Sequence, residues 1–184
     1  NRAIDIGIHH FLSNNNSTSN SNNTSNTSQL PHIIASSIEH PAILEYLKFL
    51  SQSNRIEYTL LNVNKDGFVN PSDVREALKE NTALVTIMHS NNEIGTLQPI
   101  QEISNVIKEF NQQFRRPTSV VLFHSDGAQS VGKVHVDVQS LGVDLFTVVG
   151  HKYGAPKGIA ALYVREGIRS VFSSSHFSFN LSFF

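Results

Sequence analysis

Residues 120–152 read VVLFHSDGAQSVGKVHVDVQSLGVDLFTVVGHK, and this stretch decides the fold class. It contains two apolar runs, Val120–Phe123 and Leu145–Val149, whose length and composition are typical of buried strands. Polar residues follow each run, with Asp126 after the first and Lys152 after the second. Parallel strands end at the same edge of a sheet, so this arrangement predicts a carboxylate and an amine at one rim.

Apolar runs and helical patterns alternate on both sides of this stretch. The expected helices are Pro41–Leu50, with Ile43, Leu47 and Leu50 on one face, Pro71–Leu78, and Pro99–Phe114. The expected strands are His32–Ser36, Ile56–Val63, Leu84–His89, Val120–Phe123, Leu145–Val149 and Ile159–Val164. Parallel strands need crossover connections, and the helices supply them. We therefore predict an α/β fold with a mainly parallel sheet and helices on both faces.

The ends of the chain and one internal segment depart from this pattern. Residues 1–12 carry a short apolar pattern that we interpret as a helix end, and Asn1 in place of methionine indicates an incomplete N-terminus. Residues 13–28 are all Ser, Asn or Thr, so we expect a disordered surface loop. Residues 170–184 are dominated by Ser and Phe without a period, and we expect an atypical, artefactual tail. The folded domain then spans residues 29–169.

Composition excludes several classes of function. The hydrophobic content of 39% supports a packed core, and the formal net charge of -1 leaves no broad basic surface. We therefore expect no nucleic acid and no membrane as partners. The chain has no cysteine, which excludes disulfides and a cysteine nucleophile of its own. The spacing of the histidines does not favour a metal site, so we predict none.

The amine and carboxylate at the predicted rim suit one kind of chemistry. A lysine amine can form a Schiff base with an aldehyde cofactor, and a carboxylate facing a pyridine nitrogen keeps that nitrogen protonated. A protonated ring is a better electron sink. Taken alone, an Asp and a Lys at strand ends most often form a solvated salt bridge or a helix cap.

Four segments together resemble the class V pyridoxal-phosphate enzymes, and especially the selenocysteine lyases and cysteine desulfurases. They are Ser37-Ile38-Glu39-His40-Pro41-Ala42, Asn91-Asn92-Glu93-Ile94-Gly95, Asp126-Gly127-Ala128-Gln129-Ser130-Val131-Gly132-Lys133, and Val149-Gly150-His151-Lys152 with the residues up to Arg165. The resemblance implies that residues 29–169 are part of the large pyridoxal-phosphate-binding domain of the aspartate aminotransferase fold. It also implies a fragment of a longer enzyme.

The resemblance assigns a role to six residues. Lys152 would form the Schiff base and later move protons, and Asp126 would pair with the pyridinium nitrogen. Gln129 would hydrogen-bond the phenolic oxygen of pyridoxal 5'-phosphate, and His40 would stack on its ring. Asn91 would lie near the cofactor oxygen and the substrate carboxylate, and His151 would contact the phosphate. Each has a plainer reading: His40 as a helix-entry residue, Asn91 as a turn residue, and Gln129 and His151 as ordinary rim residues.

The substrate is predicted less directly. Val149 stands where many desulfurases have a serine that contacts the phosphate, and the segment Phe146–Lys152 resembles selenocysteine lyases more closely. We therefore favour a selenocysteine lyase, which releases alanine and selenide from L-selenocysteine. The alternatives are a cysteine desulfurase acting on L-cysteine and a non-catalytic truncated paralogue.

The resemblance also sets expectations for the whole enzyme. It implies an upstream glycine-threonine-glutamate segment, a later substrate-binding arginine and a chalcogen-accepting cysteine loop, all absent from this sequence. We therefore expect little or no turnover by this chain alone. The complete enzyme is expected to be a homodimer in the cytoplasm, with the mitochondrion and the nucleus left open.

Overall fold

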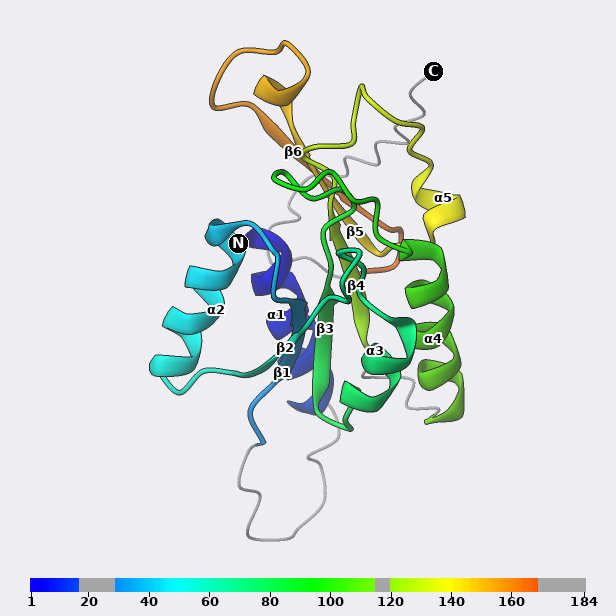
Figure 1. Cartoon of the computed structure of the whole chain (residues 1–184). Helices are drawn as coiled ribbons and strands as arrows, with labels where there is room; N and C mark the ends of the chain where they lie inside the picture. The colour runs from blue at the N-terminus through cyan, green and yellow to red at the C-terminus, as the bar shows by residue number, and fades with distance from the viewer. Residues whose placement is uncertain (17–28, 115–119, 169–184) are drawn as a thin grey trace, which may run out of the picture.

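The computed structural model describes residues 1–16, 29–114 and 120–168. In this part of the chain, six strands form one sheet in the order β2-β1-β3-β4-β5-β6 (Figure 1). The strands are β1 (His32–Ser36), β2 (Glu57–Leu61), β3 (Thr82–Thr86), β4 (Leu122–Asp126), β5 (Leu145–Val149) and β6 (Ala160–Val164). Neighbouring strands from β2 to β5 are parallel, which confirms the predicted α/β fold with a mainly parallel sheet.

Strand β6 is the exception, because it runs antiparallel to β5, with Val149 opposite Ala160. We had expected the strand but not its direction. The connection from β5 to β6 holds only the 3₁₀ turn η1 (Gly150–Lys152) and turn residues. A parallel return needs a longer crossover, so this short connection brings the chain back as a hairpin.

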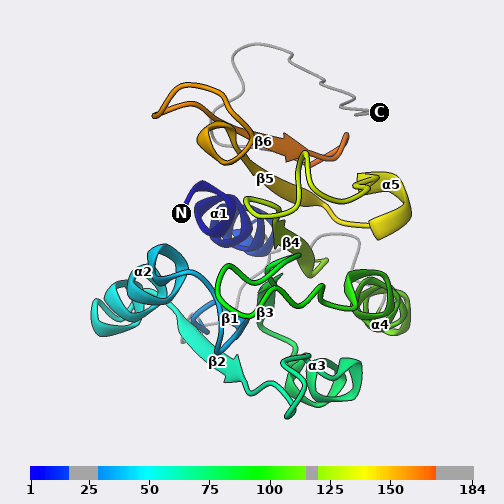
Figure 2. The same ribbon diagram turned by 45° about the horizontal axis from the view of Figure 1, so that its top comes forward.

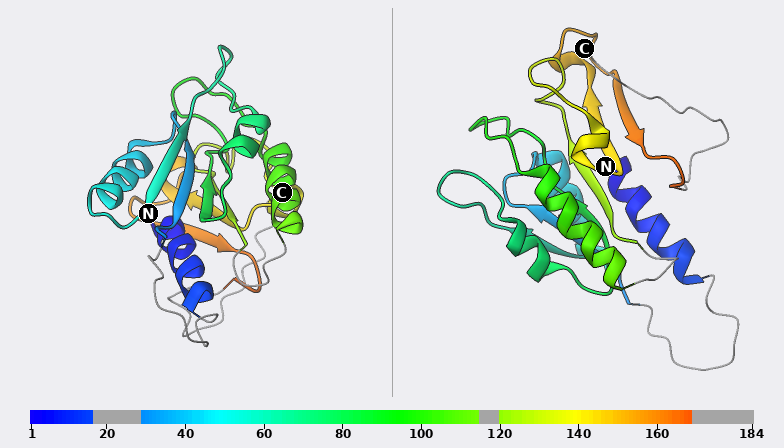
Figure 3. Two further views of the ribbon diagram at one scale, coloured as in Figure 1. Left: turned by 90° about the horizontal axis from the view of Figure 1, so that it is seen from below. Right: turned by 90° about the vertical axis from the view of Figure 1, so that its right-hand side faces the viewer.

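Helices cover both faces of the sheet, as predicted. They are α1 (Arg2–Asn16), α2 (Pro41–Gln52), α3 (Pro71–Ala77), α4 (Ile100–Gln113) and the single turn α5 (Val138–Leu141), which we had not predicted. Figure 2 shows α1 and α2 on one side of the sheet and α3, α4 and α5 on the other. Figure 3 shows the same separation of α1 from α4 from a second direction.

The two layers follow from the alternation of side chains along each strand. On β1, Ile33 and Ala35 face the apolar residues of α1 and α2, whereas Ile34 belongs to the cluster beneath α3 and α4. Helix α2 contributes Ile43, Leu47 and Leu50 to the first cluster, which confirms the predicted buried face. Burial on both faces explains why the central strands read as nearly continuous apolar runs.

The observed boundaries correct several expected ones. Helix α1 continues through Asn16, so Ser13–Asn16 is not part of a loop. Extending an existing helix by a residue adds one hydrogen bond and needs no new nucleus, which lets poor helix formers join its end. Strand β4 begins at Leu122 and includes Asp126, because the sheet ladder continues through polar residues that pair with β5. Residues 17–28 and 169–184, including most of the predicted loop and all of the predicted tail, lie outside the described residues.

Candidate cofactor site

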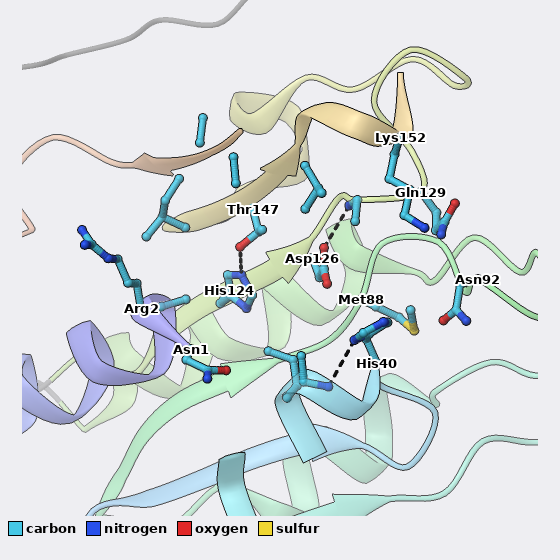
Figure 4. Close-up of a pocket in the computed structure, with 18 of the residues that line it drawn as sticks. Asn1, Arg2, His40, Met88, Asn92, His124, Asp126, Gln129, Thr147 and Lys152 are labelled. Atoms are coloured by element: carbon cyan, nitrogen blue, oxygen red, sulfur yellow. Dashed lines mark hydrogen bonds between the residues drawn. The ribbon is translucent and has the colours of Figure 1, made fainter. Parts of the chain in front are cut away.

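A cavity of about 800 Å³ lies where β1, β3, β4 and β5 end (Figure 4). This is the edge at which open α/β sheets bind ligands. Five of the six predicted site residues line it, namely His40, Asp126, Gln129, His151 and Lys152. Its wall also contains Arg2, Met88, Asn92, His124, Thr147 and Val149. The fold therefore brings together residues from segments that are far apart in the sequence.

Asp126 is the last residue of β4 and projects into this cavity (Figure 4). Its Oδ1 accepts a hydrogen bond of 2.9 Å from the backbone N–H of Ala128. Burial raises the pKa of Asp126 above its usual range, although the Ala128 N–H and the charges of His40 and Lys152 act in the opposite direction. Because burial outweighs these contributions, the surrounding protein only partly offsets the negative charge of the carboxylate. A cation that enters the cavity is stabilised beside it.

His124 lies two residues before Asp126, and alternation along β4 places both on one face of the sheet. Its ring nitrogens form hydrogen bonds of 2.8 Å with the hydroxyls of Thr86 on β3 and Thr147 on β5. Burial lowers the pKa of His124 to about 3, so the ring is neutral and adds no charge next to Asp126. The place of this histidine in the cavity wall was not predicted.

Lys152 and His151 lie on η1, immediately after β5. The N–H of Gly150 donates to the carbonyl of Ile159 at 2.9 Å, and the carbonyl of Gly150 accepts from the N–H of Ala155 at 3.1 Å, so the turn is tied to the start of β6. Figure 4 shows the side chain of Lys152 entering the cavity beside Gln129. Among the described residues, none forms a hydrogen bond with its Nζ. The amine is therefore available to an aldehyde.

His40 and Gln129 present their side chains from opposite sides of the cavity (Figure 4). His40 caps α2, with its Nδ1 accepting from the N–H of Ala42 at 3.1 Å, so a neutral ring carries its proton on Nε2. Gln129 Oε1 accepts a 2.8 Å hydrogen bond from Lys133 Nζ. This bond leaves the amide nitrogen of Gln129 as the donor available to a ligand.

Asn91 is the predicted site residue that the structure does not place in the cavity wall. Its Nδ2 donates to the carbonyl of Ile38 at 3.0 Å, and its Oδ1 accepts from the N–H groups of Glu93 and Ile94 at 2.8 and 2.9 Å. All three bonds hold the loop after β3 in place. Its neighbour Asn92 lines the cavity instead.

The turn after Asp126 depends on the absence of a side chain at Gly127. A Cβ at this position would overlap the ring of Phe146, which is 1% exposed and packed in the core. We therefore expect Gly127→Ala to lower the free energy of unfolding by about 1–3 kcal/mol, the usual cost of overpacking. The thermal midpoint would fall by roughly 2–4 °C per kcal/mol, measured by circular dichroism. Adding Phe146→Leu should restore part of this loss, and an unchanged midpoint in Gly127→Ala would contradict the packing argument.

The residues of the cavity fit pyridoxal 5'-phosphate. The volume lies in the range of small-molecule sites. The under-compensated carboxylate of Asp126 suits a pyridinium N–H, and the amine of Lys152 suits an aldehyde. The imidazole of His40 offers a flat surface to an aromatic ring, while the amide of Gln129 and the imidazole of His151 supply hydrogen-bond donors. Together they complement the nitrogen, aldehyde, ring and oxygen atoms of that cofactor.

This fold and this site are those expected of an α/β domain that binds pyridoxal phosphate. The family model described as aminotransferase class V matches residues 14–179, so the chain belongs to the class V aminotransferase family. The family is dependent on pyridoxal phosphate, and the chain's relatives in it are cysteine desulfurases.

Three similar proteins illustrate the relationship. Cysteine desulfurase IscS of Dictyoglomus turgidum is 46% identical over 138 residues, which cover 75% of this chain and 32% of that protein. The mitosomal cysteine desulfurase of Trachipleistophora hominis is 41% identical over 135 residues, covering 73% of this chain and 28% of that protein. A solved structure, SspA in complex with cysteine, is 42% identical with a TM-score of 0.67, covering 74% of this chain and 37% of that one.

These comparisons refine the sequence predictions. The chain spans about a third of the length of the curated relatives it matches. Their names favour cysteine desulfurase, our alternative, and give no support to selenocysteine lyase, which we had favoured. The relatives include bacterial and mitosomal proteins, so they leave the compartment open. No helix in the described ranges has both the length and the apolar character needed to cross a bilayer.

Proposed function

We propose that this chain is the cofactor-binding part of a pyridoxal-phosphate-dependent cysteine desulfurase. The observation that carries the proposal is the meeting of Asp126 and Lys152 in the wall of one cavity at the carboxyl ends of the strands. When bound, the cofactor supplies an electron sink for cleavage of a bond in an amino-acid substrate. The proposal assigns L-cysteine as substrate and L-alanine as one product.

Each residue of the site has a defined task in this proposal. Asp126, as a carboxylate, would hold a proton on the pyridine nitrogen, because the protein only partly offsets its charge. The Nζ of Lys152 would hold the cofactor at its aldehyde carbon and would move protons there. His40 would cover one face of the ring, and the amide of Gln129 would donate to the phenolic oxygen. His151 would contact the phosphate.

Two residues differ from what the resemblance implies. The predicted role of Asn91 near the substrate carboxylate requires the loop after β3 to turn its amide inward, whereas Asn92 already lines the cavity. Val149 lines the cavity with an apolar side chain, so it offers no hydroxyl to the phosphate. The task of holding the phosphate therefore depends more heavily on His151.

The activity, the substrate and the partners of the complete protein belong to the proposal as well. The names of the relatives and the structure in complex with cysteine support cysteine as the substrate. We propose a homodimer for the complete protein, as the family resemblance implies. Since the chain covers about a third of its relatives, we propose that it binds the cofactor but has little or no turnover alone.

The test is a titration of the purified chain with pyridoxal phosphate, followed by absorbance, with pyridoxal as the matched control without a phosphate. We expect saturable binding of pyridoxal phosphate and at least about tenfold weaker binding of pyridoxal, since a charge-assisted phosphate contact contributes about 1.5–3 kcal/mol. Adding L-cysteine to the loaded chain should change the spectrum, whereas L-alanine should change it less. A response to L-selenocysteine alone would favour the lyase, and absence of any cofactor binding would refute the proposal.

A further inference from the structure

Glu39 is a buried carboxyl group next to the cavity, with 4% of its surface exposed. It lies in the turn between β1 and α2, immediately before His40. Its Oε1 accepts two hydrogen bonds, from Ser36 Oγ at 2.5 Å and from the N–H of Met88 at 2.7 Å. Its Oε2 is buried and has no hydrogen-bond partner in the described part of the chain. One oxygen making both contacts is the pattern of the carbonyl oxygen in a protonated carboxyl group.

The charges around Glu39 also favour the neutral acid. Burial raises the pKa of Glu39 to about 8, and the like charge of Asp126 on β4 acts in the same direction, while the two hydrogen bonds that Glu39 accepts oppose the rise. The positive charges of His40 and Lys152 act on Asp126. His89, in the loop after β3, is neutral because burial lowers its pKa. Below about pH 8, Glu39 therefore retains its proton.

The hydrogen bond from the N–H of Met88 to Glu39 connects the two segments that form one side of the cavity, whereas the bond from Ser36 lies within the first of them. Met88 lies in the loop between β3 and α4, and His40 follows Glu39 in the turn between β1 and α2. Both side chains line the cavity and lie close together (Figure 4). A second bond joins the same segments, from Asn91 Nδ2 to the carbonyl of Ile38. The placement of His40 therefore depends on this connection.

Building on the proposed function, we propose that Glu39 is a positioning residue for the cofactor site, acting as a neutral hydrogen-bond acceptor. It fastens the β1–α2 turn to the β3–α4 loop and thereby holds His40 and Met88 at the cavity. Loss of its proton places a second buried anion near Asp126, where the two negative charges repel each other. The site then keeps its shape only while Glu39 remains protonated.

The test compares the chain with Glu39→Gln and Glu39→Ala by titration with pyridoxal phosphate at about pH 7 and pH 9. Glutamine keeps a carbonyl oxygen for both donors and cannot ionise, so we expect it to bind like the original chain at pH 7. From pH 7 to pH 9, the original chain should lose about tenfold more affinity than Glu39→Gln, the equivalent of one pKa unit. Glu39→Ala should bind at least about tenfold more weakly at both pH values. Weak binding by Glu39→Gln at pH 7, or equal pH dependence of the two proteins, would overturn the proposal.

A second readout needs no cofactor and separates this inference from the proposed function. Hydrogen exchange at the Met88 amide should be faster in Glu39→Ala and unchanged in Glu39→Gln. Because the folded pKa is raised, Glu39 stabilises the fold below its ordinary pKa, and this contribution is lost as the pH rises toward about 8. The unfolding temperature of the original chain should therefore fall relative to Glu39→Gln over that range. If none of the proteins binds cofactor, the proposed function fails. Equal exchange at the Met88 amide in all three proteins would overturn the proposal that Glu39 fastens the β1–α2 turn to the β3–α4 loop.

Discussion

Replacing Lys152 with alanine is expected to abolish the borohydride-stable attachment of pyridoxal phosphate to this chain. Lys152 is the lysine that lines the cavity within the described residues, and its Nζ has no hydrogen-bond partner there. Reduction converts the imine between an amine and the cofactor into a stable bond, so the adduct appears as added mass on the intact protein. The expected effect is complete loss of this added mass, because alanine has no nucleophile.

The matched control for Lys152→Ala is Lys157→Ala. Lys157 lies in the same connection between β5 and β6 but does not line the cavity, so its replacement should leave the adduct intact. Other lysines of the chain also carry primary amines that react with aldehydes. The adduct should therefore be mapped by peptide digestion. An adduct on another lysine, with Lys152 unmodified, would contradict the assignment.

The elements that could be predicted are those whose positions depend on local patterns. The bounds of β1 and β5 match the prediction to the residue, because each is a short, mainly apolar run of the kind typical of a strand covered on both faces. Helices α2 and α3 begin at the predicted prolines, since proline is favoured at the first helical position. The direction of β6 was not predictable in this way, because an apolar run carries no information about which way the strand runs.

In the candidate site, too, local sequence patterns predicted some features and could not predict others. Asp126 and Lys152 were expected at one rim because both follow apolar strands, and the structure places both in the cavity wall. The place of His124 was missed because its partners, Thr86 and Thr147, become neighbours only when β3, β4 and β5 pair. Asn91 and Asn92 are adjacent in the chain, and no sequence pattern indicates which amide turns toward the cavity. The burial of Glu39 could not be predicted either, because its contact with Met88 joins residues that are far apart in the sequence.

Asp126→Asn is expected to change stability and cofactor binding in opposite directions. Burial raises the folded pKa of Asp126, so this carboxyl stabilises the fold below its ordinary pKa and loses that contribution as the pH rises through its folded pKa. Without cofactor, this buried carboxyl therefore stabilises the folded chain less at neutral pH than in acid. Asparagine keeps the Oδ1 that accepts from Ala128 and removes the charge. The variant should unfold at a higher temperature at pH 7, by roughly 2–4 °C for each kcal/mol recovered, and the advantage should vanish in acid.

The same substitution should weaken binding of pyridoxal phosphate by about 10- to 100-fold, because a charge-assisted hydrogen bond contributes about 1.5–3 kcal/mol. Asp126→Ala is the control, since it removes both the charge and the acceptor of the Ala128 N–H, and it should lose stability as well as binding. An asparagine variant that binds as tightly as the original chain, or that unfolds at a lower temperature at pH 7, would contradict the argument. Opposite signs would show that the carboxylate is retained for the ligand at a cost to the fold, as expected of a functional charge rather than a structural one.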